Sequence, residues 1–115
     1  MTHRASRAIV CGLVSGLLLP AVVFATTPVS EENHLQFEKK FAQMCIQKEK
    51  KDMEGSGVLL SEVTSMCECI AKEESKRVTS DEVRQYVFED QYPASLMMKS
   101  NAATYTCIER QKGAP

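Results

Sequence analysis

The sequence predicts an all-α domain, a small bundle of about four helices held together by disulfide bonds. Apolar residues recur at helical spacing in four stretches, and no stretch shows sustained alternation of apolar and polar residues. Four cysteines remain after an N-terminal export signal, Cys45, Cys67, Cys69 and Cys107. An even number of cysteines in a small exported domain indicates two disulfides.

The first 25 residues have the three parts of a secretory signal peptide. Residues 1–7 are basic, residues 8–24 form an apolar run, and Val23-Phe24-Ala25 supplies the small residues read at cleavage. A membrane anchor is the alternative, but Pro20 interrupts the run and no basic stop-transfer flank follows. We therefore expect cleavage after Ala25 and a periplasmic or secreted protein.

The mature chain, residues 26–115, has 90 residues and forms at most one domain. Without Arg4 and Arg7, 12 basic residues stand against 15 acidic ones, a net charge of −3 that argues against nucleic-acid binding. The sequence has no glycine-rich phosphate loop, nucleophile elbow or haem-attachment motif. We expect no enzymatic activity, no cofactor and no stable membrane span in the mature chain.

The first two helices are expected to form a hairpin. Ser30 is a good N-cap for a helix that runs to about Lys51. Its buried face follows i, i+4, i+7 spacing and comprises Phe37, Phe41 and Met44. Gly55-Ser56-Gly57 then makes a turn. The second helix begins between Val58 and Ser61, and its inward stripe comprises Val63, Met66, Cys67 and Ile70.

Two further helices are expected in the C-terminal half. Thr79-Ser80-Asp81-Glu82 matches a capping box and opens a helix that ends before Pro93. Its buried residues are Val83, Tyr86 and Val87, with Phe88 on a side. The last helix begins at Pro93 or Ser95 and turns Leu96, Ala103 and Cys107 inwards, and residues 112–115 form a frayed tail. The acidic pairs Glu73-Glu74 and Asp81-Glu82 are expected to be solvated faces and caps.

The cysteine spacing restricts the disulfide pairing. Cys67 and Cys69 point about 200° apart on a helix, so they cannot bridge each other. Antiparallel helices joined at Ser56 place residues level when their numbers average 56, which favours Cys45–Cys67 and Cys69–Cys107. A longer loop centred on Gly57 would favour Cys45–Cys69 instead.

Three alternatives involve particular side chains. Thiolates and thioethers select copper(I), so Cys67, Cys69 and Met66 are the residues of an alternative soft-metal site. Thiol–disulfide exchange by Cys67 is a second alternative, although Glu68 would raise the pKa of that thiol. The third is a partner surface, since three large apolar residues in a row cannot all face one side of a helix. Its candidate residues are Tyr92, Leu96, Met97 and Met98.

The order of Cys45, Met66-Cys67-Glu68-Cys69, the capped helix at residues 79–82 and Cys107 resembles small exported proteobacterial proteins. Those carry an aromatic-Cys-x-Cys segment with a single cysteine on either side, and here Met66 takes the aromatic position. The resemblance implies a periplasmic helical disulfide fold and no particular activity. We expect a non-catalytic module that binds a protein or another envelope component, with soft-metal or thiol handling as the alternative.

Overall fold

The computed structural model describes Gly16 and residues 27–113, and all regular secondary structure in that part of the chain is helical. The elements in chain order are α1 (Glu31–Asp52), α2 (Leu60–Ser75), α3 (Ser80–Val83), the π-helical turn η1 (Arg84–Phe88) and α4 (Ala94–Gly113). This confirms the predicted small all-α bundle. The predicted signal peptide and the expected first mature residue, Thr26, lie outside the described residues, Gly16 apart. None of the described helices is long and apolar enough to cross a membrane.

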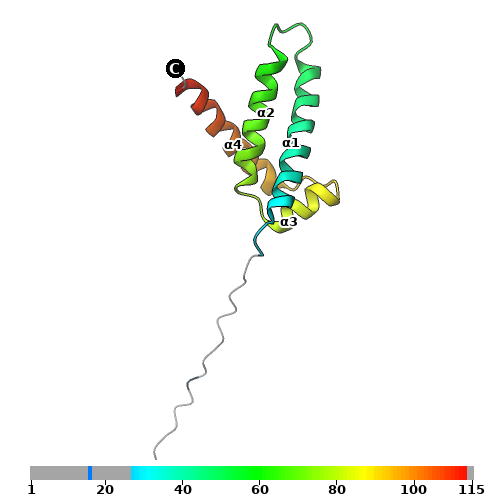
Figure 1. The fold of residues 1–115 in the computed structure, drawn as a ribbon, viewed down its shortest axis with the longest axis vertical. Helices are drawn as coiled ribbons and strands as arrows, with labels where there is room; N and C mark the ends of the chain where they lie inside the picture. The colour runs from blue at the N-terminus through cyan, green and yellow to red at the C-terminus, as the bar shows by residue number, and fades with distance from the viewer. Residues whose placement is uncertain (1–15, 17–26, 114–115) are drawn as a thin grey trace, which may run out of the picture.

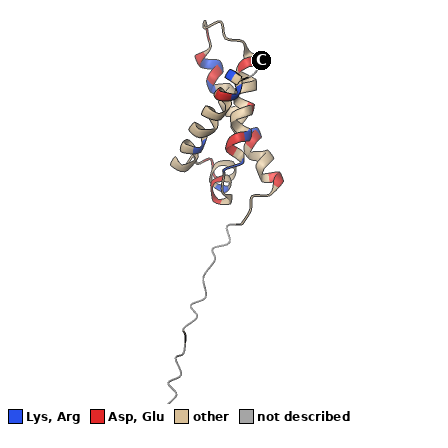
Figure 2. Ribbon diagram, turned by 90° about the vertical axis from the view of Figure 1, so that its left-hand side faces the viewer, with Lys and Arg blue, Asp and Glu red and all other residues tan. Residues whose placement is uncertain are grey.

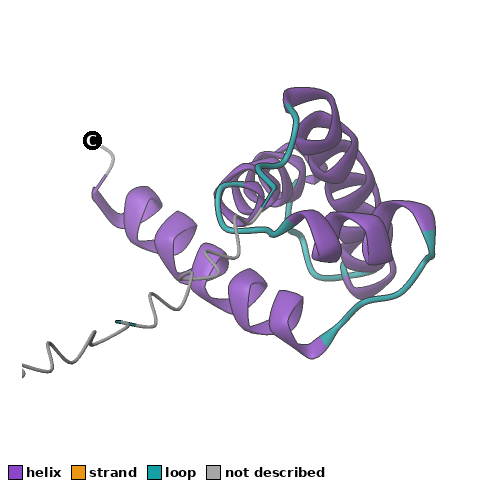
Figure 3. Cartoon of the chain, turned by 90° about the horizontal axis from the view of Figure 1, so that it is seen from below, coloured by secondary structure: helices purple, strands orange, loops and turns teal. Residues whose placement is uncertain are grey.

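Helix α2 occupies the centre of the arrangement. It pairs with α1 as an antiparallel hairpin, while α4 packs against its other flank (Figure 1). The short α3 and η1 lie at the end of the hairpin opposite its turn, and a segment without regular structure leads from them to α4 (Figure 3). The first and last helices therefore lie on opposite sides of α2, as expected from the opposed directions of Cys67 and Cys69.

The starts of α1 and α3 follow from local hydrogen bonds that the sequence predicts. Ser30 Oγ accepts a hydrogen bond from the Asn33 amide at 3.2 Å and caps α1. At α3, Thr79 Oγ1 accepts from the Glu82 amide at 3.2 Å, and Glu82 Oε2 accepts from the Thr79 amide at 2.8 Å. Both donors would otherwise lack a partner, so this capping box fixes where α3 begins.

The core consists of two apolar clusters. The larger contains Phe37, Val78, Val83, Tyr86 and Leu96, where α1, α3, η1 and α4 meet. The smaller contains Ile70, Ala103 and Cys107 at the contact between α2 and α4. Phe41 packs against both clusters and joins them.

Several expectations about individual residues are wrong. Met44 is 55% exposed, because it faces a groove that no described element covers. The expected third helix is divided into α3 and the π-helical turn η1. Helix α4 continues to Gly113, so residues 112 and 113 are helical where a frayed tail was expected. Basic residues in the last turn, Arg110 and Lys112, favour that extension because they complement the negative end of the helix dipole.

Charged residues of both signs are mixed along the helices. Figure 2 shows acidic and basic residues interspersed on the side that it presents. Ion pairs of this kind join Lys76 to Glu73 at 2.8 Å and Arg110 to Glu73 at 2.7 Å. This distribution agrees with the near balance of charge in the sequence.

Candidate functional site

Cys45, Cys67, Cys69 and Cys107 form two disulfides, Cys45–Cys67 (S–S 2.07 Å) and Cys69–Cys107 (S–S 2.09 Å). This is the pairing that the hairpin register favours. The first disulfide joins α2 to α1 and the second joins α2 to α4, so the central helix is covalently fixed on both flanks. Cys67 and Cys107 are each 1% exposed.

The residues of the alternative metal site are not brought together as ligands. Cys67 and Cys69 are bonded to different helices, and Met66 packs against the Ile70–Ala103–Cys107 cluster. Across residues 27–113, no group of three or more histidine, cysteine or acidic residues is arranged to hold a metal ion. Disulfide sulfurs offer no thiolate, which weakly opposes a copper or thiol function.

The candidate partner surface is only partly exposed. Met97 is 56% exposed, Met98 74% and Tyr92 42%. Leu96 is 0% exposed, and its inclusion in that surface is a prediction that the structure corrects. Successive residues on a helix diverge by about 100°, so the first turn of α4 can bury Leu96 against Phe37 only by leaving its neighbours outside.

A groove of about 800 Å³ lies where α1, α4 and the η1–α4 segment meet over α2. Its predominantly apolar lining comprises Phe41, Met44, Cys45, Ile70, Tyr86 and Tyr92, with Ser100 and Thr104 from α4. Charged side chains at its edge are Lys40, Lys48, Glu49 and Asp90. Its size and its apolar lining with a few polar groups are typical of sites that bind small molecules or apolar segments of other proteins.

One end of the groove is held by Lys40 of α1. Its ammonium group donates to the carbonyl oxygens of Tyr86 at 2.7 Å and Val87 at 3.4 Å, and it forms an ion pair with Asp90. It also lies 5.1 Å from the centre of the Tyr86 ring. The last carbonyls of a helix lack partners within the helix, so Lys40 completes the end of η1 and ties it to α1.

The aromatic side chains at this end are packed together. The ring centres of Tyr86 and Tyr92 are 5.5 Å apart in an edge-on arrangement, and those of Phe37 and Tyr86 are 5.3 Å apart. Burial raises the pKa of Tyr86 to about 12, so its hydroxyl stays protonated at neutral pH. The wall of the groove thus continues directly from the core.

The two acidic pairs were expected to be solvated faces and caps. Glu82 is the expected cap of α3 and Asp81 is exposed, but three of the four side chains are buried. Glu73 is 5% exposed, Glu74 0% and Glu82 6%. Burial raises the pKa of Glu74 to about 7, outweighing the opposite effects of the Tyr92 and Ser100 hydroxyls. Burial also acts to raise the pKa of Glu82, but hydrogen bonds from Lys99, Ser95 and the Thr79 amide lower it overall. The acidic pairs look alike in the sequence, so the sequence does not reveal that the pKa values of Glu74 and Glu82 shift in opposite directions.

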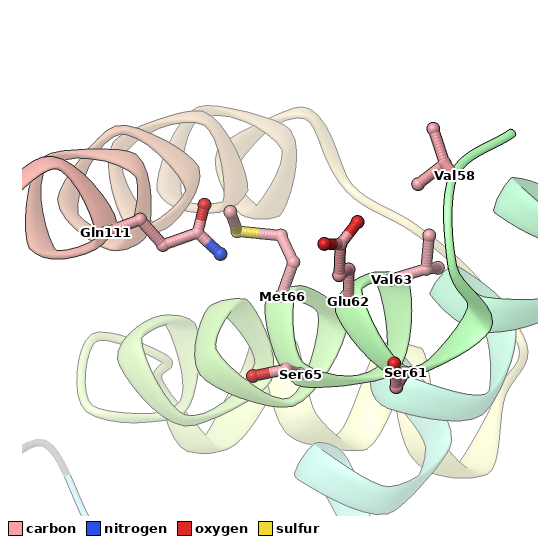
Figure 4. Close-up of a pocket in the computed structure, with 7 residues that line it drawn as sticks. All are labelled: Val58, Ser61, Glu62, Val63, Ser65, Met66 and Gln111. Atoms are coloured by element: carbon pink, nitrogen blue, oxygen red, sulfur yellow. The ribbon is translucent and has the colours of Figure 1, made fainter. Parts of the chain in front are cut away.

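A second hollow lies between the start of α2 and the end of α4. It measures about 620 Å³ and is lined by Val58, Ser61, Glu62, Val63, Ser65, Met66 and Gln111. The Met66 and Gln111 side chains point toward each other across it (Figure 4). Its polar and apolar groups are mixed, and Glu62 supplies its one charge, so it gives less indication of a ligand than the groove.

No protein-family model, curated protein or solved structure matches this chain. The resemblance to small exported proteobacterial proteins therefore stays a prediction from the cysteine pattern. Fold and site define a disulfide-stapled helical domain with an apolar groove beside its central helix.

Proposed function

We propose that this protein is a non-catalytic, exported helical module that binds a protein or another envelope component in the groove between α1 and α4. The observation that carries the proposal is the groove itself, about 800 Å³ in volume and lined mainly by apolar and aromatic side chains. Such a groove favours an apolar ligand surface.

The disulfides support a binding role because they hold the walls of the groove in place. They close loops with sequence separations of 22 and 38 residues. In the chain-entropy model these loops contribute about 3.4 and about 3.9 kcal/mol to stability. A site that is formed before the ligand arrives avoids the cost of ordering its walls on binding.

The exposed methionines at the start of α4 add apolar surface outside the groove. Met97 and Met98 follow Tyr92, which lines the groove. Methionine side chains are flexible and polarisable, and they are common on surfaces that adapt to several partners. Export is inferred from the signal-peptide pattern and from paired cysteines, which persist in oxidising compartments.

Site-specific variants test the proposal with the neutral dye Nile red as a probe of the groove. We expect saturable binding of one dye molecule, weakened at least about tenfold by Met44→Lys, because a charge is placed on an apolar surface. Tyr105→Lys is the matched control, since Tyr105 is 65% exposed and does not line the groove. Equal binding by both variants would contradict the groove as the site.

A second experiment separates this function from metal or thiol handling. Protein purified from the cell envelope should begin at Thr26 or a close neighbour and contain no free thiols. Its intact mass should be unchanged by added copper(I). Four free thiols together with a bound copper ion would favour the alternative that uses Cys67, Cys69 and Met66.

A further inference from the structure

Glu74 is fully buried but poorly hydrogen-bonded. Its Oε2 atom has no hydrogen-bond partner among the described residues. Its Oε1 atom accepts from the Tyr92 hydroxyl at a long 3.4 Å. That hydroxyl is also 3.4 Å from the carbonyl oxygen of Leu96, so its single proton is shared between two acceptors. Besides Tyr92, only the Ser100 hydroxyl among the described residues acts on the carboxyl group as a hydrogen-bond donor, so an ionised carboxylate here would have two hydroxyls and no ion pair to stabilise it.

Tyr92 covers Glu74 and also forms part of the groove wall. It lies in the segment between η1 and α4, where Asp90 has a left-handed φ of 53°. The segment is held by the Lys40–Asp90 ion pair and by a hydrogen bond from the Gln91 amide to the Gln85 carbonyl at 2.8 Å. A movement of Tyr92 would therefore change the groove and the burial of Glu74 together.

The groups around Glu74 do not supply a compensating charge. Lys99 of α4 donates to Glu82 of α3 at 2.6 Å and so is already paired. Tyr86 of η1 and Tyr92 carry neutral hydroxyl groups. Ser100, which lies on α4, faces the carboxyl group of Glu74. From α1, His34 Nδ1 lies 2.9 Å from the hydroxyl of Ser75, the residue after Glu74.

We propose that Glu74 is a proton-controlled latch for the groove. When its carboxyl group is protonated, Tyr92 stays packed over it and the wall is closed. When the proton leaves, Tyr92 and residues 89–93 move outwards, water reaches the carboxylate, and the groove widens. The consequence for ligand binding rests on the proposed function, whereas the movement of Tyr92 does not.

Desolvation decides the direction of this change. A stronger hydrogen bond from Tyr92 to the ionised carboxylate would hold the wall closed, but burial is the larger influence on Glu74 and raises its pKa to about 7. The balance therefore favours hydration of the charge over retention of one long hydrogen bond. Because the expected titration midpoint of Glu74 is close to neutral pH, both the closed and the open state of the groove wall can be studied in solution.

NMR on the wild-type protein tests the latch without any ligand. We expect the side-chain carboxyl carbon of Glu74 and the ring protons of Tyr92 to titrate together, with a shared midpoint between about pH 6 and 8. A Glu74 midpoint near its ordinary value of 4.5, or Tyr92 signals that do not change with it, would overturn the proposal.

Nile red binding then tests the effect on the groove. We expect affinity at pH 8.5 to exceed that at pH 5.5 by at least about threefold in the wild type, since the dye binds the open state better. Glu74→Gln should remove this pH dependence. Glu73→Gln is the neighbouring control, and His34→Gln is a second control, because His34 of α1 contacts the hydroxyl of Ser75, the residue after Glu74. Both should keep the dependence.

The outcomes distinguish the latch from the binding function. A Tyr92 transition without dye binding would support the latch and count against the groove as a binding site. Dye binding that depends on pH equally in the wild type and in Glu74→Gln would overturn the latch and leave the groove intact. If Glu74→Gln does not fold, the joint NMR titration in the wild type decides the question.

Discussion

Glu73 and Glu74 are adjacent on α2 and both buried, yet the pKa values of their carboxyl groups shift in opposite directions. Hydrogen bonds from Lys76 and then Arg110 lower the pKa of Glu73. Burial without an ion pair raises the pKa of Glu74 to about 7. Successive residues on a helix point about 100° apart, so Glu73 lies at the charged edge of α2 whereas Glu74 points into the core.

Stability should depend on pH through Glu74. Because its folded-state pKa is raised, the protonated carboxyl contributes stability that is fully present below pH 4.5 and is lost as pH rises through about 7. The wild type should be less stable at pH 8 than at pH 5 by up to about 3 kcal/mol from this group. Glu74→Gln should lose that difference and gain stability at pH 8. Urea unfolding at both pH values measures the free energy of unfolding. An equal change between pH 5 and pH 8 in the wild type and in Glu74→Gln would show that Glu74 is not the group responsible.

Lys40 should matter more than its neighbour Lys39. Lys40→Met removes the donor for the carbonyls of Tyr86 and Val87, and we expect a loss of about 1–2 kcal/mol in the free energy of unfolding. Lys39→Met changes an exposed side chain and should stay within about 0.5 kcal/mol of the wild type. Denaturant titration compares the two variants. Similar losses in the free energy of unfolding for both variants would mean that the hydrogen bonds from Lys40 to η1 do not stabilise the fold.

The first turn of α4 contains both core and surface residues. Leu96→Ala should cost about 2–5 kcal/mol, since Leu96 is fully buried and its truncation leaves a cavity. Met98→Lys should leave the melting temperature nearly unchanged, because Met98 is 74% exposed. Thermal unfolding followed by circular dichroism measures both. A large drop for Met98→Lys would place that side chain in the core.

The disulfide pairing can be checked chemically. Stepwise reduction with alkylation, followed by peptide mass analysis, should recover Cys45 linked to Cys67 and Cys69 linked to Cys107. Replacing Cys45 and Cys67 together by alanine should cost about 3 kcal/mol in the chain-entropy model. Recovery of Cys45 linked to Cys69 would contradict the hairpin register.

Local signals account for the features that could be predicted from the sequence. Ser30 and the Thr79–Glu82 capping box mark helix starts through hydrogen bonds that span three residues. The register of the α1–α2 hairpin follows from one short turn, where Gly55 and Gly57 take left-handed φ values of 84° and 75°. Each of these depends on residues close together in the chain, so a sequence pattern can specify them.

Long-range contacts explain the features that could not be predicted. Met44 has helical spacing from Phe37 and Phe41 but faces the groove, because no described element covers that part of α1. Glu74 is of a residue type usually found on surfaces, yet it is fully buried and contacts Tyr92, which lies 18 positions later in the chain. No spacing rule within one helix contains that information.

The two disulfides give the covalent chain a particular topology. The closed loops 45–67 and 69–107 do not overlap, and Glu68 alone connects them, so the backbone forms a figure of eight with Glu68 at its waist. One break in the backbone anywhere else between Cys45 and Cys107 leaves every fragment attached. A break beside Glu68 releases two separate halves, each closed by its own disulfide. Between Cys45 and Cys107, the continuity of the oxidised chain therefore depends on the two peptide bonds of one exposed residue in the middle of α2.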